Sequence, residues 1–200
     1  MANPKDYLQP EFFRFGWDSL FLVEEVLART KFQSRAFRLL ELGAGSGVVS
    51  CEVSQRLVPS ELDLVEAQEE WRPYLLGNLQ QHGHFAQPAS IHWTTVGRFN
   101  PAGALKYDLI LSNPPYFHPD RGRPSPNAQR NAAHRLILDD WATWLSCFHR
   151  SLAMGGEAWW LQKDPGPQLG AFPIEAGFEL KHEVRSGPMR LLCLRRLNVE

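Results

Sequence analysis

Short apolar runs alternate with longer amphipathic segments along this chain. The runs have the length and composition of β-strands, and we expect seven of them. They are Phe37–Leu42, Leu62–Glu66, Ser90–Thr95, Tyr107–Asn113, Gly156–Lys163, Phe178–Arg185 and Met189–Leu197. Helical patterns fall between most of these runs, over Asp18–Thr30, Val48–Leu57, Glu69–Gln81 and Leu138–Ala153. The acids near the start of the last pattern suit a helix N-terminus.

The alternation of strand and helix predicts an α/β fold with a seven-stranded, mostly parallel sheet and helices on both faces. Only residues 186–188 separate the last two runs, a connection too short for a crossover helix, so we expect the last strand to be antiparallel. The segment Phe117–Ile137 contains three prolines and has no helical apolar pattern until its end. We expect it to form a long surface loop of the kind that often carries function.

Length and composition indicate one domain spanning residues 1–200. The chain has 200 residues, 44% of them hydrophobic and 22% charged, which is enough for a full core. The apolar runs are far shorter than the ~18 residues of a membrane span. Since no basic segment leads into an apolar one near residue 1, we expect a cytoplasmic protein. No spacing indicates a metal site, and we expect three widely separated cysteines to be small core residues: Cys51, Cys147 and Cys193.

A glycine-rich segment, residues 41–47, follows the first predicted strand and precedes a helix. The dinucleotide fingerprint needs Gly or Ala where Val48 stands, and a phosphate-binding P-loop needs a lysine, so NAD and ATP are disfavoured. Glu41 would repel phosphate but suits a positive amino or sulfonium group. Glu66, which ends the second strand, can accept hydrogen bonds from both hydroxyls of a ribose. The alternative is a tight turn beside a solvated strand end.

The tetrapeptide Asn113-Pro114-Pro115-Tyr116 ends the fourth predicted strand. Prolines cannot continue a central strand, and they hold the preceding residue extended before any substrate arrives. An aryl amine or amide nitrogen is a poor nucleophile because its lone pair is delocalised. The Asn113 side-chain oxygen and the Pro114 carbonyl could each accept one N–H while Tyr116 stacks on the planar group. This arrangement suits direct in-line methyl transfer. Alternatively, the prolines merely end a strand.

With these motifs, the sequence resembles class I S-adenosylmethionine-dependent methyltransferases and, within them, the bacterial tRNA-valine adenine-N6-methyltransferase family. The resemblance covers most of the chain and rests on Phe15–Leu20, Glu41–Gly47, Asn113–Phe117 and Gly122–Asn127. It implies a Rossmann-like fold, S-adenosylmethionine as cofactor, and the exocyclic amine of an adenine in RNA, above all tRNA, as methyl acceptor. Asn-Pro-Pro-Tyr also occurs in protein-glutamine methyltransferases, whereas Phe117 and the Ser-Pro-Asn segment favour the RNA branch.

The resemblance also implies roles for individual residues. Asn113 and Pro114 hold the target amine, Tyr116 stacks on it, and residues 1–35 cover the cofactor. Asp18 either belongs to this cover or is the N-cap of the helix that follows it. The residues implied in the cofactor site are Glu41, Gly43, Ala44, Gly45, Gly47, Glu66, Ala67 and Asn113.

One position departs from the pattern of such enzymes. After the third strand they usually place an acid against the adenine amine of the cofactor, but Trp93–Arg98 contains none. We expect Thr95 or a backbone carbonyl to substitute for it.

A basic segment follows the Asn-Pro-Pro-Tyr motif. Since the net charge is −1, contact with RNA phosphates requires a local basic patch. Between Asp120 and Asp139 there is no acid, and we expect Phe117 and four arginines to contact RNA: Arg121, Arg123, Arg130 and Arg135. The alternative is a solvated loop. Two other functions are weighed: a protein-glutamine methyltransferase would carry a larger domain before the sheet than about 35 residues allow, and an inactive scaffold would have lost the glycines or Asn113.

Overall fold

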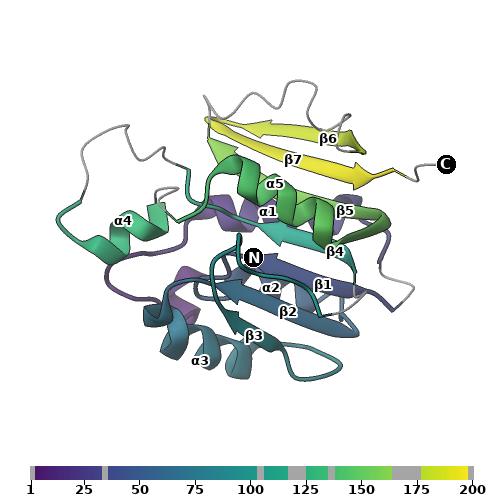
Figure 1. The fold of residues 1–200 in the computed structure, drawn as a ribbon. Coiled ribbons are helices and arrows are strands. Elements are labelled where there is room, and N and C mark those ends of the chain that lie inside the picture. Colours follow the sequence, from purple (N-terminus) through teal and green to yellow (C-terminus); the bar gives the residue numbers. More distant parts are fainter. Residues whose placement is uncertain are drawn as a thin grey trace.

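The computed structural model describes residues 3–32, 36–102, 106–116, 125–134, 138–163 and 177–197. Its centre is a seven-stranded sheet with the strand order β3-β2-β1-β4-β5-β7-β6 (Figure 1). The strands are β1 (Arg38–Leu42), β2 (Glu61–Glu66), β3 (Ser90–Trp93), β4 (Tyr107–Ser112), β5 (Leu152–Lys163), β6 (Phe178–Ser186) and β7 (Met189–Arg196). The helices are α1 (Trp17–Arg29), α2 (Val48–Ser54), α3 (Arg72–His82), α4 (Ala128–His134) and α5 (Trp141–Ser151), with 3-10 turns η1 (Pro4–Asp6) and η3 (Glu69–Trp71).

The strand directions confirm the predicted fold class. Strands β1 to β5 pair in parallel, whereas β7 runs antiparallel to both β5 and β6. Ser186 pairs with Met189, so the turn between β6 and β7 contains only Gly187 and Pro188. Gly187 has a φ of 55°, a left-handed conformation that glycine adopts without steric cost. Because it pairs with both β5 and β6, the last strand, β7, lies between them.

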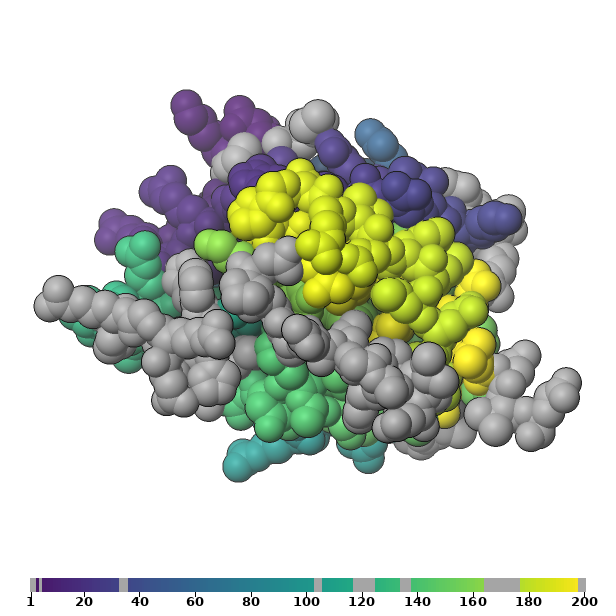
Figure 2. Space-filling view, turned by 90° about the horizontal axis from the view of Figure 1, so that it is seen from above, coloured from purple at the N-terminus to yellow at the C-terminus, as the bar shows by residue number. Residues whose placement is uncertain are grey.

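The central strands of the sheet are buried on both faces. Successive side chains of a strand point to opposite faces, so each of these strands contributes to two core clusters. On one face Leu39 and Leu109 belong to a core cluster that includes residues of α1, α2 and α3. On the other face Leu40 and Ile110 pack in a cluster with Trp144 and other residues of α5. Figure 2 shows residues of β6 and β7 at the surface between the N-terminal segment and α5, although Leu191–Leu194 of β7 are fully buried. None of the helices in the described ranges is long and apolar enough to cross a membrane.

Several expected elements differ in their bounds. Strand β5 begins at Leu152, not Gly156, and β3 ends at Trp93, not Thr95. Helix α5 begins at Trp141, not Leu138, because the Asp140 side chain accepts a hydrogen bond from the Thr143 amide at 2.8 Å and caps the helix. The predicted loop 117–137 contains the helix α4, so the expectation of an unstructured surface loop was wrong for residues 128–134. Asn127 precedes α4 and accepts from the Arg130 amide at 2.8 Å, and alanine favours helix without producing an apolar stripe. The expected burial of all three cysteines is confirmed.

The sheet brings three loops together at one edge. Leu42 of β1 pairs with Val65 of β2 on one side and with Ser112 of β4 on the other. Gly43 and Asn113, which follow β1 and β4, therefore lie at the same edge of the sheet as Glu66, the last residue of β2. The strand order reverses at β1, and ligands of open α/β sheets bind in the crevice at such a reversal.

Candidate active site

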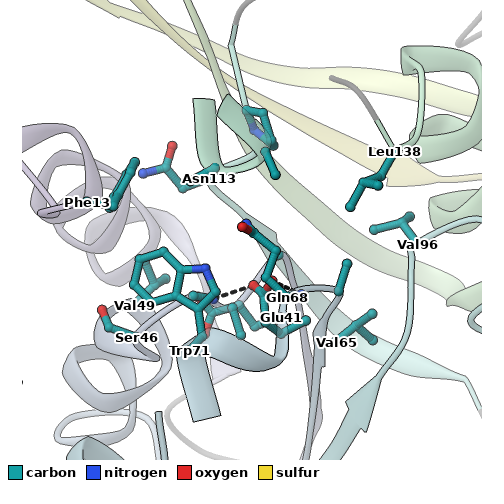
Figure 3. A pocket seen from close by; sticks show the side chains of 18 of the residues that line it. Phe13, Glu41, Ser46, Val49, Val65, Gln68, Trp71, Val96, Asn113 and Leu138 are labelled. Atoms are coloured by element: carbon teal, nitrogen blue, oxygen red, sulfur yellow. Dashed lines mark hydrogen bonds between the residues drawn. The ribbon is translucent and has the colours of Figure 1, made fainter. Parts of the chain in front are cut away.

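A cavity of about 850 Å³, part of it open to solvent, lies at this edge of the sheet. Asn113 and Phe13 lie on one side of the cavity, while Val96 and Leu138 lie on the opposite side (Figure 3). Between them the walls come from the β1–α2 loop and the residues after β2.

Backbone hydrogen bonds and three left-handed glycines shape the β1–α2 loop. Gly43, Gly45 and Gly47 have φ values of 70°, 53° and 75°, which other residues adopt only with strain. The amides of Gly43 and Ala44 both donate to the Val65 carbonyl, at 2.9 and 3.0 Å. Gly43, Ala44 and Gly45 line the cavity, whereas Gly47 does not and instead begins α2 as its N-cap. The shape of this loop is thus determined by its backbone conformation and backbone hydrogen bonds.

Glu66 holds the loop from the end of β2. Its side chain is 6% exposed, and its two oxygens accept hydrogen bonds at 2.8 Å, one from the Gly45 amide and one from the Gln68 amide. Burial raises the pKa of this carboxyl, and hydrogen bonds from backbone amides act in the opposite direction. The Ala67 amide is a third donor to this carboxylate, whose two oxygens offer about four acceptor positions in all. Glu66 and Ala67 both line the cavity, so a ribose hydroxyl could reach the remaining acceptor position.

Glu41 is the second buried acid of the cavity wall. It is 2% exposed and accepts hydrogen bonds from the Ser50 amide at 3.1 Å and from the Ser50 hydroxyl. Burial raises the pKa of Glu41 to about 8, because the charged form is poorly solvated there. A cationic ligand would favour the ionised form.

Asn113 is oriented by the start of α1. Its side-chain nitrogen donates to the Ser19 hydroxyl at 2.9 Å, and its side-chain oxygen accepts from the Tyr116 hydroxyl. The Asp18 carboxylate lies 2.8 Å from the same hydroxyl, so the single proton of Tyr116 is shared between Asn113 and Asp18. Asp18 is therefore a partner of Tyr116. Of the two alternatives for Asp18, the N-cap of α1 is wrong, since the N-cap is Gly16. Asp18 is also not among the described residues that line the cavity.

The other residues of the tetrapeptide differ in their exposure to the cavity. Pro115 lines it, whereas Pro114 is buried and is not among the lining residues. Tyr116 is partly buried and packs against the core cluster on the α1 face. Burial and the neighbouring Asp18 carboxylate raise the pKa of Tyr116, so its hydroxyl remains a donor. Asn113 and Pro115 are thus the two members of the tetrapeptide that line the cavity.

The N-terminal segment forms one wall. Phe13, Phe15 and Ser19 line the cavity, and Phe13 packs edge-on against Trp71 with 5.5 Å between ring centroids. Buried Asn78 ties this wall to the glycine loop, because its side-chain nitrogen donates to the carbonyls of Leu8 and Ser46, both at 2.9 Å. Phe15 belongs to the motif Phe15–Leu20 on which the resemblance rests, whereas Phe13 and Trp71 were not singled out, since nothing in their spacing separates them from ordinary core.

At the end of β3 the expected residue is not the one that faces the cavity. Thr94 and Val96 line it, whereas Thr95 does not, and the Thr95 carbonyl accepts from the amides of Arg98 and Phe99. Asp139 also lines the cavity here. The sequence offered only one signal for Asp139, an acid at a helix start, and that role belongs to its neighbour Asp140.

The basic segment contributes to the wall through small residues. Ala132 and Ala133 of α4 line the cavity, and Arg130 of the same helix is exposed. Side-chain hydrogen bonds hold the start of this segment, since Asn131 both donates to the Ser125 carbonyl at 2.6 Å and accepts from its amide at 2.8 Å. Four residues expected to bind RNA lie outside the described residues: Phe117, Arg121, Arg123 and Arg135.

The charge of the cavity selects among ligands. Its wall carries three acids, Glu41, Glu66 and Asp139, and among the described residues that line it there is no lysine, arginine or histidine. Such a wall favours a positively charged ligand over one rich in phosphate. Within the described ranges, no three His, Cys, Asp or Glu side chains are grouped so that they could hold a metal ion.

Comparison with known proteins identifies a family. The model of the methyltransferase small domain family matches residues 15–140. A tRNA1(Val) (adenine(37)-N6)-methyltransferase of Dyadobacter fermentans is 29% identical over 150 residues, which are 74% of this chain and 60% of that protein. The protein of the same name from Yersinia pestis is 31% identical over 119 residues, 52% of this chain and 48% of its own. The chain thus spans only about half to three fifths of these relatives.

A solved structure supports the same fold. The S-adenosylmethionine-dependent methyltransferase of Aquifex aeolicus superposes with a TM-score of 0.63 over 90% of this chain and 93% of its own. The two sequences are 15% identical, so the likeness concerns the fold alone.

Proposed function

This chain belongs to the methyltransferase small domain family, and we propose that it transfers the methyl group of S-adenosylmethionine to the exocyclic amine of an adenine in RNA, with tRNA as the substrate class. The observation that carries the proposal is the position of Asn113. It follows β4 at the carboxyl edge of the sheet, beside the glycine loop, with its amide oriented by Ser19 and Tyr116. The names of the curated relatives support RNA as the substrate.

The residues present fit S-adenosylmethionine. The acids Glu41 and Glu66 suit its positive charges and its ribose hydroxyls, and the β1–α2 glycines allow close approach of the backbone. The carboxyl ends of β4, β1, β2 and β3 follow one another along the sheet, so a nucleoside with an amino-acid tail can lie across them. Bound in this way, the cofactor supplies an electrophilic methyl group on sulfur.

Asn113 prepares the target nitrogen for attack. Its side-chain oxygen has two lone pairs, so it can accept an N–H of the adenine amine beside the Tyr116 hydroxyl. The Pro114 carbonyl is the proposed acceptor of the second N–H. Two acceptors draw the nitrogen lone pair out of the plane of the ring, towards the methyl group. No general base has to act first, because the proton is lost from a cationic product.

The target base must leave its stack to reach Asn113. Single-stranded loops provide unstacked bases at little cost, and enzymes that modify bases act on such substrates or extrude the base. Tyr116 is the proposed stacking partner, and Phe117 with Arg121, Arg123, Arg130 and Arg135 is the proposed contact to the RNA.

Methyl transfer from labelled S-adenosylmethionine tests the proposal directly. The acceptors are an RNA with an adenine in a loop, the same sequence in a duplex, and a glutamine-containing peptide. We expect transfer to the loop adenine, less to the duplex, and none to the peptide. Transfer to the peptide alone would establish a protein-glutamine methyltransferase instead.

Calorimetry gives an independent test of the cofactor site. We expect wild type to bind S-adenosylmethionine and Glu66→Ala to bind it roughly 10- to 100-fold more weakly, as expected for a lost hydrogen bond to a charged group. Equal affinities would remove Glu66 from the site. Absence of binding to folded wild type would overturn the proposed enzyme.

A further inference from the structure

We propose that Asp139 is the specificity residue that reads the adenine amine of the cofactor, in place of the acid missing after β3. The inference rests on the proposed use of S-adenosylmethionine. Residues 93–98 contain no acid. Asp139 lies more than 40 residues further along the chain, yet its carboxylate reaches this strand end.

Two backbone amides hold the Asp139 carboxylate at the end of β3. One oxygen accepts from the Val96 amide at 2.8 Å, and the other accepts from the Gly97 amide at 3.1 Å. Both oxygens keep a free lone pair. Since Asp139 lines the cavity, these lone pairs can serve a ligand inside it.

The close approach of Asp139 depends on a glycine. A Cβ atom at Gly97 would lie 2.7 Å from an oxygen of Asp139 and 3.0 Å from the Thr143 methyl group. Any larger residue at position 97 would push the carboxylate away. The sequence around this strand end is thus suited to receive an acid from elsewhere in the chain.

The position of Asp139 corresponds to the base end of the cavity. Asn113, where methyl transfer occurs, follows β4, and Glu66 at the end of β2 suits the ribose. Along the sheet from β4 through β1 to β2, the next strand end is that of β3. There Val96 and Leu138 offer apolar contact on the side of the cavity opposite Asn113 (Figure 3). A flat base against these side chains would present its edge to Asp139.

The chemistry of the carboxylate determines which base it accepts. An ionised carboxylate only accepts hydrogen bonds, and the exocyclic amine of adenine donates them. Hypoxanthine carries a carbonyl oxygen at that position, which the carboxylate repels. Asparagine at position 139 would instead offer an amide N–H that suits the carbonyl.

Calorimetry with S-adenosylhomocysteine and S-inosylhomocysteine tests this assignment without turnover or RNA. We expect wild type to prefer the adenosyl ligand by roughly 10- to 100-fold, as for a hydrogen bond to a charged group. In Asp139→Asn the preference should fall towards one or invert. A variant that merely perturbs the loop would weaken the binding of both ligands by the same factor and leave the ratio of the two affinities unchanged.

The matched control is Asp140→Asn. Asp140 is adjacent and exposed and caps α5, and asparagine caps as well as aspartate does. It removes the same charge, so the ligand ratio should stay at the wild-type value. An unchanged ratio in Asp139→Asn, or no preference in wild type, would overturn the role of Asp139 alone. If folded wild type binds neither ligand, the proposed cofactor falls and this inference with it.

Discussion

The two sides of the cavity are held together in different ways. On the side of β1 and β2, the amides of Gly43 and Ala44 donate to the Val65 carbonyl, and the Gly45 amide donates to Glu66. On the side of β4, the contacts join side chains that are distant in sequence. Asn113 bonds to Ser19, 94 residues away, and Tyr116 bonds to Asp18, 98 residues away.

This difference separates two tasks. A loop held by backbone bonds keeps its geometry whether or not a ligand is bound, which suits a cofactor that returns in every cycle. Side-chain hydrogen bonds can exchange partners at little cost. In the proposed reaction, the Asn113 oxygen can therefore accept from the target amine when a base enters. Substitutions on the β4 side should accordingly change turnover, whereas substitutions on the β1 and β2 side should change stability or cofactor affinity.

The largest effect is expected for Asn113→Ala. It removes the acceptor that redirects the nitrogen lone pair, and losing one preorganised catalytic hydrogen bond costs on the order of 100- to 1,000-fold in turnover. Single-turnover transfer to an unpaired adenine measures this effect, with melting temperature and cofactor affinity as controls. A wild-type rate would refute the mechanism, and loss of folding would make Asn113 a structural turn residue.

On the other side of the cavity, Glu41 should make stability depend on pH. Its carboxyl has a pKa of about 8 in the folded protein against 4.5 ordinarily, so between these values the folded state holds a proton that the unfolded state lacks. The unfolding free energy contributed by this group therefore falls as pH rises through that window. Glu41→Gln should remove this loss. The unfolding free energy of the variant relative to wild type should therefore increase by on the order of 3 kcal/mol as the pH rises from 5 to 8.

Denaturant unfolding at several pH values measures the Glu41 effect, because glutamine keeps an oxygen that can accept from Ser50. Parallel stability curves for wild type and Glu41→Gln would show that the carboxyl titrates normally.

A smaller effect is expected for Tyr116→Phe. The variant keeps the ring but loses the hydrogen bonds of the hydroxyl to Asn113 and Asp18. We expect turnover to fall about 3- to 10-fold, since one such bond contributes about 1 kcal/mol. Asp18→Asn retains an acceptor for the hydroxyl and should stay near wild type. If both variants match wild type, this network does not orient Asn113.

The smallest effect is expected for Arg130→Ala. Arg130 is exposed on α4, and losing one phosphate contact should reduce the log–log salt slope of RNA binding by about 0.7 to 0.9. Cofactor affinity should not change. Arg56→Ala is the matched control, because Arg56 is also exposed but lies between α2 and β2, at the opposite edge of the sheet. Equal slopes in all three proteins would show that Arg130 does not contact phosphate.

Much of the molecule could be predicted from local pattern. The central strands follow from apolar runs, since a strand buried on both faces needs apolar residues at nearly every position. The edge strand β6 instead alternates apolar and polar residues, as expected for a half-exposed strand. The glycine loop and Asn113 were recognisable because their backbone requirements are local. Helix α4 was missed, since alanines form a helix without any apolar stripe. The start of α5 was placed too early because Asp140, the second of its two acids, is the N-cap.

What the sequence determined by itself is therefore the set of elements and the residues whose own conformation is special, such as Gly43, Gly45 and Pro114. Only the tertiary structure decided which distant side chains meet. It placed Asp139 at the end of β3, Ser19 against Asn113, and Asp18 on Tyr116. The physical reason is that φ and ψ preferences act within a few residues, whereas a carboxylate held by two amides of another loop depends on the packing of the whole sheet.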